Sequence, residues 1–193
     1  YLAFLGRTSC EKGLHRAIEI AKRSGMPLKI AAKTDKDEQE FFDNRIKPLL
    51  DSPDIEFLGE IGYPEKNKFL GEAAALLFPI SWPEPFGIVM IEAMACGTPV
   101  IAFPLGSVPE VIKDGVSGLI VPDVPGAVDA VRRVKHLDRK KVRKYFEQRF
   151  TAARMTQQYV HIYERLTSGK KAPLSTVDGV LNWMKLTSPS STT

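Results

Sequence analysis

The sequence of 193 residues has few cysteines and no long apolar run. Cys10 and Cys96 have no CxxC pair or Cys/His cluster near them, which argues against a zinc site or a disulfide framework and favours the cytoplasm. Glu92 interrupts the longest apolar run, Pro85 to Leu105, so no segment reaches the roughly 20 apolar residues of a membrane-spanning helix. The start, Tyr1 to Arg7, lacks the features of a secretion signal and looks like the first strand of a domain.

A marked excess of one charge is also missing. Lysine plus arginine (27) against aspartate plus glutamate (23) gives +4, which suits an anionic ligand but falls short of a nucleic-acid-binding surface. No nucleic-acid partner is therefore expected. Apolar residues (44%) and charged residues (26%) occur at the frequencies of an ordinary globular protein, and the length allows one well-buried core.

Short apolar runs alternate with segments of helical spacing, such as 14–21, 41–49 and 88–95. Short, bounded apolar runs are typical of parallel strands that are buried on both faces. The alternation predicts an α/β fold, a Rossmann-like, doubly wound and mostly parallel sheet flanked by helices. The expected strands are 2–5, 28–31, 55–58, 74–78, 99–102 and 118–121.

The chain is expected to divide at Leu166. Two further helices are predicted from Arg139 to Leu166, because apolar residues recur there at helical spacing. Residues 1–166 would form the Rossmann-like domain, and residues 167–193, rich in Ser, Thr, Pro and Lys, a partly disordered tail. An apolar stretch in that tail, 180–184, could dock elsewhere on the protein.

The most informative segment runs from 83 to 101. Pro85 should keep Glu84 extended, while Phe86-Gly87 opens a helix that closes at Gly97 before the next strand. The start of this helix would lie at the carboxyl end of a strand, where open α/β sheets bind ligands. Its unpaired amides would offer partial positive charge to a phosphate, and glycine lets a diphosphate approach the backbone. The residues expected at this phosphate site are Phe86, Gly87, Ile88 and Val89.

Two carboxylates accompany that helix start. Glu92 is the only charge in an otherwise apolar helix, and burying it without a partner would cost several kcal/mol or force its protonation. Its partner would be the vicinal diol of a ribose, as in dinucleotide-binding folds, or a buried Arg or Lys. Glu84, eight positions earlier, would either project over the same crevice or be a solvated loop carboxylate.

A cationic segment follows the first expected strand. Gly6-Arg7 and then Glu11-Lys12-Gly13 place two cations at the carboxyl end of that strand, where they would neutralise a nucleoside diphosphate. Lys12 could instead be a solvated lysine at a helix start. The helix dipole disfavours a cation there, which favours the functional interpretation.

The pattern Glu84-x7-Glu92, with Pro85-Phe86-Gly87 inside it, resembles the signature of the retaining glycosyltransferases of family four, which have a GT-B fold. The first loop, with Arg7 and Lys12, resembles the family loop that grips the donor pyrophosphate. The resemblance covers about residues 1–166 and includes the segments 55–59, 73–74, 78–81 and 109–121. Two departures from the family pattern are Ala31-Ala32-Lys33, where a glycine is usual, and Gly106-Ser107 in place of Gly-Gly.

The resemblance implies that the chain is the donor-binding, C-terminal domain of such a transferase, without its acceptor-binding N-terminal domain. In the family the first Glu faces the donor sugar, the second holds the ribose, and the amides between them hold phosphate. The catalytic residues would then be Glu84, Arg7 and Lys12. The donor-binding residues would be Gly6, Phe86, Gly87, Ile88, Val89 and Glu92, with Ile61 near the base. The donor would be a UDP-, GDP- or ADP-sugar, with no metal and no other cofactor.

The implied reaction transfers a sugar from a nucleoside diphosphate, with retention, to a sugar, glycan or lipid-linked acceptor. This chain alone should bind the donor without transferring it, because the acceptor side and the closure between domains are absent. One alternative is a non-catalytic module that binds nucleotide sugars. Another is a dinucleotide-dependent oxidoreductase, which is disfavoured because residues 6–11 contain no GxGxxG.

Other signals carry less weight. Asp35-Lys36-Asp37 matches a DxD metal motif but is better interpreted as a helix start capped at Thr34. The histidines, His15, His136 and His161, stand apart from any ligand cluster. The basic stretch 132–144 is expected to be a solvated face, with peripheral contact to an anionic membrane as the alternative.

Overall fold

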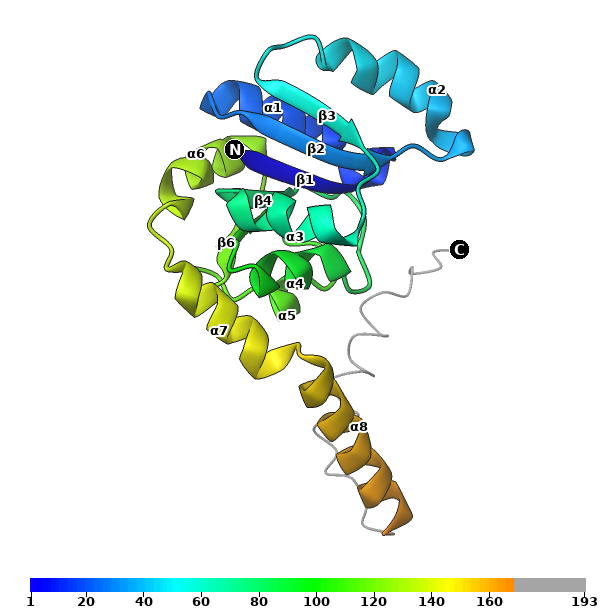
Figure 1. Cartoon of the computed structure of the whole chain (residues 1–193), viewed down its shortest axis with the longest axis vertical. Coiled ribbons are helices and arrows are strands. Elements are labelled where there is room, and N and C mark those ends of the chain that lie inside the picture. Colours follow the sequence, from blue (N-terminus) through cyan, green and yellow to red (C-terminus); the bar gives the residue numbers. More distant parts are fainter. Residues whose placement is uncertain (169–193) are drawn as a thin grey trace, which may run out of the picture. The chain divides into compact units, whose positions relative to one another are not determined.

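The computed structural model describes residues 1–168, so the apolar stretch 180–184 and nearly all of the expected tail lie outside it (Figure 1). The chain forms two compact units, Tyr1–Phe150 and Thr151–Thr193. The first unit ends at Phe150 rather than at Leu166, and the helix α8 (Ala152–Thr167) belongs to the second. The expected domain division at Leu166 stays a prediction.

The first unit is built on a six-stranded sheet in the order β3-β2-β1-β4-β5-β6, with neighbouring strands parallel. The strands are β1 (Leu2–Arg7), β2 (Leu28–Lys33), β3 (Ile55–Gly59), β4 (Ala75–Phe78), β5 (Val100–Ala102) and β6 (Gly118–Ile120). Each coincides with an apolar run in the sequence. The predicted α/β class and doubly wound parallel sheet are confirmed.

The helices of the first unit lie between these strands in the sequence or, for the last two, follow β6. The longer ones are α1 (Leu14–Ser24), α3 (Tyr63–Glu72), α4 (Ile88–Ala95), α6 (Val124–Val134) and α7 (Arg139–Arg149). Shorter elements are η1 (Cys10–Lys12), η2 (Lys36–Glu38), α2 (Gln39–Phe41), η3 (Phe42–Ile46), η4 (Lys47–Leu49) and α5 (Val108–Val111).

Helices α1, α4, α7 and α8 were predicted, whereas α3 and α6 were not. The expected helix over 41–49 is broken into a π-helical turn and a 3-10 turn, because Pro48 at the start of η4 has no N–H to continue the helix. Helix α6 begins where the Asp123 side chain accepts a hydrogen bond from Gly126 N at 2.8 Å, a standard N-cap.

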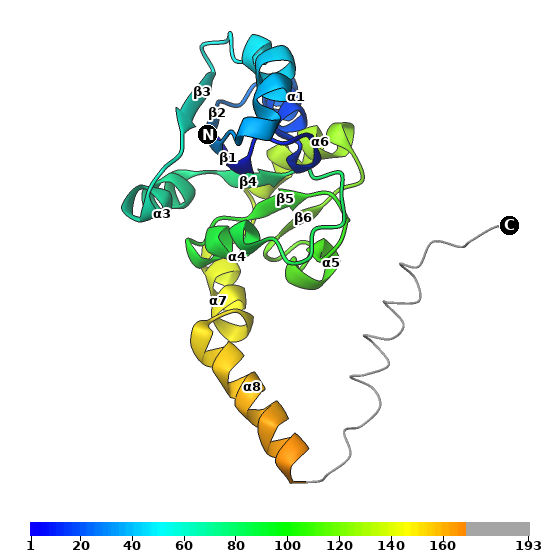
Figure 2. The same cartoon turned by 90° about the vertical axis from the view of Figure 1, so that its right-hand side faces the viewer.

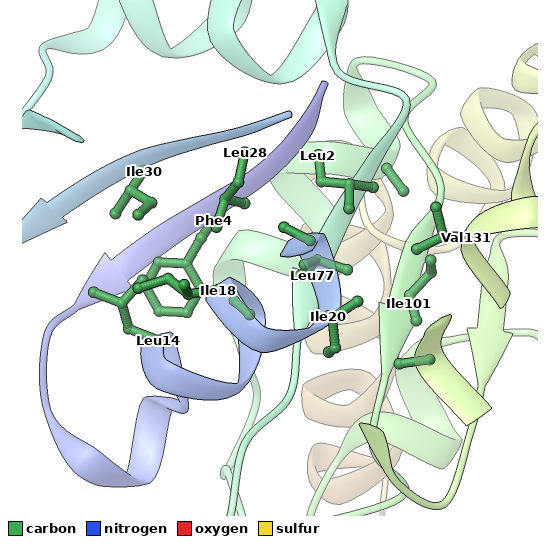
Figure 3. Packing of buried hydrophobic residues seen from close by; sticks show 14 of the residues in the cluster. Leu2, Phe4, Leu14, Ile18, Ile20, Leu28, Ile30, Leu77, Ile101 and Val131 are labelled. Atoms are coloured by element: carbon green, nitrogen blue, oxygen red, sulfur yellow. The ribbon is translucent and has the colours of Figure 1, made fainter. Parts of the chain in front are cut away.

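The core lies on both faces of the sheet, because alternate residues of each strand point to opposite sides. From β1, Leu2 and Phe4 face α1 and α6, whereas Ala3 faces α3 and α4. Figure 3 shows Phe4 lying against Leu14 and Ile18 of α1. Figure 2 shows the two helical layers with the sheet between them. The first unit therefore folds around one central sheet whose faces are both covered.

The strand order places a topological switch point between β1 and β4. The chain moves outward from β1 through β2 to β3, and then returns to continue from β4 through β5 to β6. Connections on the two sides of such a point diverge and leave a crevice at the carboxyl ends of the two strands. Of the candidate site residues, Arg7 is the last residue of β1, and Lys12 and Glu84 lie in the segments that follow β1 and β4.

Candidate functional site

A pocket of about 370 Å³ opens beside this switch point, over the carboxyl ends of β1 and β2 and against α4. Its lining residues come from β1, β2, α3 and α4 and from the loops that follow β1 and β3. They are Leu5, Gly6, Arg7, Lys12, Ala31, Ala32, Lys33, Glu60, Ile61, Lys66, Val89 and Glu92. Residues predicted from the sequence as one site, among them Gly6, Lys12 and Glu92, therefore share one pocket.

The loop after β1 is shaped by Gly13, which has φ of +77° and joins η1 to α1. A side chain at this position would place its Cβ 2.1 Å from the carbonyl oxygen of Pro79, which is too close for any residue but glycine. Ser81 N donates to the Glu11 carbonyl at 2.9 Å, so the loops after β1 and β4 are joined. This close contact fixes Lys12 beside the segment that contains Glu84.

Lys12, Trp82 and Glu84 form a compact cluster. The Lys12 ammonium donates to Oε2 of Glu84, and the two side chains are only 17% and 13% exposed. The indole Nε1 of Trp82 donates to the same oxygen at 2.8 Å, and the Lys12 Nζ lies 5.1 Å from the centre of the indole ring. Glu84 is therefore a mostly buried, ion-paired carboxylate rather than a solvated loop residue.

The backbone around Glu84 is held by the loop after β5. Ser107 N donates to the Glu84 carbonyl and Ser107 Oγ to the Phe86 carbonyl, both at 2.9 Å. Gly106 has φ of +58°, and a Cβ there would lie 2.3 Å from the Glu84 carbonyl oxygen. The sequence marked Gly106-Ser107 only as a departure from a family pattern. The structure shows that both residues position Glu84.

Helix α4 starts as predicted, with Gly87 as its N-cap at φ of +71° and without a side-chain cap. The first amides of a helix have no partner within it, so those of Ile88 and Val89 remain available to an anion. Val89 lines the pocket, whereas the side chains of Ile88 and Phe86 are exposed. The Phe86 ring packs edge-on against Phe150 at 6.4 Å, so only the backbone of these two residues is suited to contact a ligand in the pocket.

Glu92 pairs with Lys66 of α3, at 2.8 Å between Nζ and Oε1. Both side chains line the pocket and are about one quarter exposed. Of the two partners that the sequence left open, a lysine is the one present in this structure. Because the ion pair lies in the pocket wall, it leaves Glu92 accessible, and its predicted contact with a ribose stays a prediction.

Arg7 is half exposed and surrounded by carboxylates. It approaches Glu11 at 3.4 Å, Glu38 at 3.5 Å and Asp35 at 3.8 Å. Partial burial opposes ionisation of Glu11, but the Ser9 hydroxyl and the cations of Arg7 and Lys12 outweigh it and lower the pKa of Glu11.

The region around the DxD-like motif is acidic but holds no ligand cluster. A short 3-10 turn, η2, does start here, but its N-cap is Asp35 rather than the predicted Thr34, and Asp35 makes no side-chain capping hydrogen bond. Its carboxylate instead lies near Arg7 and Lys33, the latter at 3.7 Å. Within residues 1–168, no group of three His, Cys, Asp or Glu side chains is arranged to hold a metal ion.

Part of the basic stretch 132–144 is structural. Arg139 donates to the carbonyls of Gly71 and Ala73, both at 2.6 Å, and to Thr98 Oγ1 at 2.7 Å. The solvated-face interpretation is therefore wrong for Arg139. These acceptors precede β4 and β5, so Arg139 lies at the amino end of the sheet, opposite the pocket.

No helix in the described part of the chain is long and apolar enough to cross a membrane.

Comparison with known proteins identifies the family. The family described as glycosyl transferases group 1 matches residues 1–151, which include the pocket and both carboxylates. The chain belongs to this family. The family resemblance stated from the spacing of Glu84 and Glu92 is thereby confirmed.

Relatives of this group 1 glycosyltransferase chain are longer than it is. An uncharacterised 41.2 kDa protein in the cps region of Klebsiella pneumoniae is 28% identical over 176 residues, which are 84% of this chain and 46% of the relative. A glycogen synthase of Mycobacterium tuberculosis is 32% identical over 140 residues, 69% of this chain and 33% of the relative. The chain therefore spans half or less of the length of these relatives.

Solved structures agree on the fold. AviGT4, a glycosyltransferase involved in avilamycin A biosynthesis, superimposes with a TM-score of 0.74 at 26% identity, covering 88% of this chain and 52% of its own. HepE of Anabaena, solved in complex with UDP, gives a TM-score of 0.73 at 23% identity, covering 86% of this chain and 48% of its own. The sheet and its helices thus correspond to about one half of a GT-B glycosyltransferase.

Proposed function

We propose that this chain is the donor-binding half of a retaining glycosyltransferase and that the pocket at the switch point holds a nucleoside diphosphate sugar. The observation that carries the proposal is the convergence of Lys12, Val89 and Glu92 in one pocket at the carboxyl ends of β1 and β2, beside α4. A pyrophosphate requires a cation and free helix amides, and a ribose requires a carboxylate that accepts hydrogen bonds from its hydroxyls. The complex of HepE with UDP is in keeping with this assignment.

In this proposal the pocket stabilises the leaving diphosphate. Lys12 and Arg7 would offset the negative charge that develops on it, and the amides of Ile88 and Val89 would add the positive end of the α4 dipole. No metal or other cofactor is invoked. Glu92 would accept hydrogen bonds from the ribose hydroxyls and Glu84 from the donor sugar, while Ile61 would lie near the base.

Glu84 orients the sugar in this scheme and does not attack it. One of its carboxylate oxygens is already occupied by hydrogen bonds from Lys12 and Trp82. Retention would then follow from reaction on the same face of the sugar that the leaving group departs from. The anomeric configuration of the product, read by NMR, tests this for a protein that contains both halves.

We further propose that the acceptor binds to a half of the enzyme that this chain does not contain. The chain spans about half of the length of the Klebsiella pneumoniae relative. In addition, its helix α8 has no buried residue. Exposed apolar side chains recur along that helix, at Met155, Tyr159, Val160, Ile162, Tyr163 and Leu166. An exposed stripe of this kind is expected where another part of a protein packs. The chain alone should therefore bind donor without transferring sugar, and measurable transfer to an added sugar would refute that part.

Calorimetric titration with UDP, GDP and ADP tests the donor assignment. We expect saturable binding of one diphosphate, weakened about tenfold or more by Lys12→Ala and by Glu92→Ala, because each removes a charge-assisted contact. Lys140→Ala is the matched control, since this exposed lysine adjoins Arg139 at the other end of the sheet, and it should bind as the wild type does. Failure of the folded chain to bind any of the three, or equal binding by all variants, would contradict the proposal.

A further inference from the structure

Trp82 belongs to no motif of the sequence, but its position in the structure is distinctive. It lies between the end of β4 and the start of α4, two residues before Glu84, and its side chain is partly buried. Its indole contacts both members of the Lys12–Glu84 ion pair, one through its N–H and the other through its ring. Trp82 is therefore placed to affect the orientation of both candidate catalytic side chains, Lys12 and Glu84.

The geometry at Glu84 is asymmetric. Oε2 accepts hydrogen bonds from both the Lys12 ammonium and the Trp82 indole, whereas Oε1 accepts none from any residue within 1–168. Two donors on one oxygen restrict rotation of the carboxylate and leave the acceptor capacity of the other oxygen unused. Because the side chain is only 13% exposed, the carboxylate has little room for another orientation. Glu84 therefore has one oxygen, Oε1, that is held in a fixed position and can accept a hydrogen bond from a ligand.

The two groups that donate to Glu84, the Lys12 ammonium and the Trp82 indole, differ in whether the expected ligand would also bind them. Lys12 lines the pocket, so a bound diphosphate would compete with Glu84 for its ammonium. Neither Trp82 nor Glu84 lines the pocket, so the indole N–H has no comparable anionic competitor there. Glu84 lies at the margin of the pocket, where it is paired with the lining residue Lys12. With a diphosphate bound to Lys12, the hydrogen bond from the indole would be the contact that still holds Glu84 in place.

We propose that Trp82 is a positioning residue for the donor sugar. It holds Glu84 by Oε2 so that Oε1 meets a hydroxyl of the sugar, and it thereby gives the site its preference for a sugar nucleotide over the bare diphosphate. This rests on the proposed function and adds to it a residue that acts through Glu84. The indole ring, by its contact with Lys12, also restrains the cation before the donor arrives.

The variant Trp82→Phe separates these contacts, because it keeps an aromatic ring near Lys12 and removes the N–H. Dissociation constants are measured by calorimetry for the pairs UDP and UDP-glucose, GDP and GDP-mannose, and ADP and ADP-glucose. For the pair that binds, we expect affinity for the diphosphate to stay within about twofold and affinity for the sugar nucleotide to fall about five- to tenfold. Trp82→Leu, which also removes the ring, should weaken both ligands.

A double-mutant cycle shows whether Trp82 acts through Glu84. In a Glu84→Ala background, Trp82→Phe should cause no further loss of preference for the sugar nucleotide, because the carboxylate that it positions is gone. Urea unfolding of each variant establishes that it is folded at the temperature of the titration. A further loss in that background would mean that Trp82 acts by another route, which would overturn the proposal.

The remaining outcomes are distinct. Equal weakening of diphosphate and sugar nucleotide by Trp82→Phe would give Trp82 a merely structural role and overturn the proposal, as would no change in either. If the wild-type chain bound the diphosphate and its sugar nucleotide with equal affinity, the proposal for Trp82 would also be overturned. The proposal that the pocket binds a nucleoside diphosphate would not be contradicted by that result. If the folded wild-type chain bound none of the six ligands, the proposed function itself would fail first.

Discussion

Gly13→Ala is expected to be far more damaging than an ordinary replacement of a helix-capping glycine. Gly13 has φ of +77°, and its added Cβ would lie 2.1 Å from the Pro79 carbonyl oxygen. A left-handed backbone costs alanine about 1–2 kcal/mol. Relief of the overlap would require the α1 start or the Pro79 loop to move, which also disturbs the 2.6 Å hydrogen bond from Arg16 to that carbonyl. Together these effects should lower the free energy of unfolding by about 3–5 kcal/mol.

Gly25→Ala is the matched control within the same helix. Gly25 ends α1 with φ of +69°, but its Cβ would meet nothing within 4 Å. Only the cost of the left-handed backbone remains, which gives a loss of about 1 kcal/mol after the lower entropy of the unfolded chain is taken into account. The difference between the variants, about 2 kcal/mol or more, isolates the contact with Pro79.

Urea unfolding monitored by circular dichroism measures both losses. With a denaturant slope of about 2 kcal/mol per molar urea, the midpoint for Gly13→Ala should fall about 1 M below that for Gly25→Ala. Because Lys12 adjoins Gly13, nucleotide affinity should fall in the first variant and not in the second. Equal midpoints for the two variants would refute the reasoning, since the backbone strain is the same and only the contact differs.

Three further predictions concern other parts of the fold. Arg139→Met removes a side chain that joins three acceptors at the amino end of the sheet and should cost about 2–3 kcal/mol in urea unfolding, whereas Lys140→Met should cost almost nothing. Burial, with two nearby arginine cations, lowers the pKa of His15 below 6.5, so the folded state binds fewer protons than the unfolded chain. Stability should therefore fall as pH drops below about 6.5, and less so in His15→Gln, when unfolding is compared at pH 7.5 and pH 5. Burial raises the pKa of the Cys96 thiol, whereas Cys10 is exposed; iodoacetamide followed by mass spectrometry should modify Cys10 first, and the reverse order would contradict this.

The strands and the helix at the centre of the site were predictable from the sequence because they depend on local patterns. Each strand is a short apolar run bounded by turn residues, and α4 lies between Gly87 and Gly97, both with positive φ. By contrast α3 has few apolar positions, with Phe69 and Leu70 its only buried residues. Its start depends on the Glu65 side chain, which accepts a hydrogen bond from Gly62 N at 2.7 Å. Without a clear apolar stripe, its sequence did not indicate a helix.

The partners of the candidate site residues were not predictable, because they depend on tertiary contacts. Lys66 meets Glu92 across 26 positions, and Lys12 meets Glu84 across 72. The sequence required a partner for Glu92 but contained nothing to select Lys66 from the other lysines. The contacts of Trp82 with Lys12 and Glu84 were not predictable either, because they arise from the strand order, which brings the loops after β1 and β4 together.

The central claim, that the pocket beside α4 holds a nucleoside diphosphate, is tested most directly by amide chemical shifts. The chain labelled with ¹⁵N is titrated with the one of UDP, GDP and ADP that binds, and its backbone amides are followed by NMR. We predict the largest shift changes at Gly6, Ile88 and Val89, where the diphosphate would meet the backbone. Unchanged shifts at these amides, with the largest changes instead beside the groove lined by His15 and Asn44, would contradict the claim.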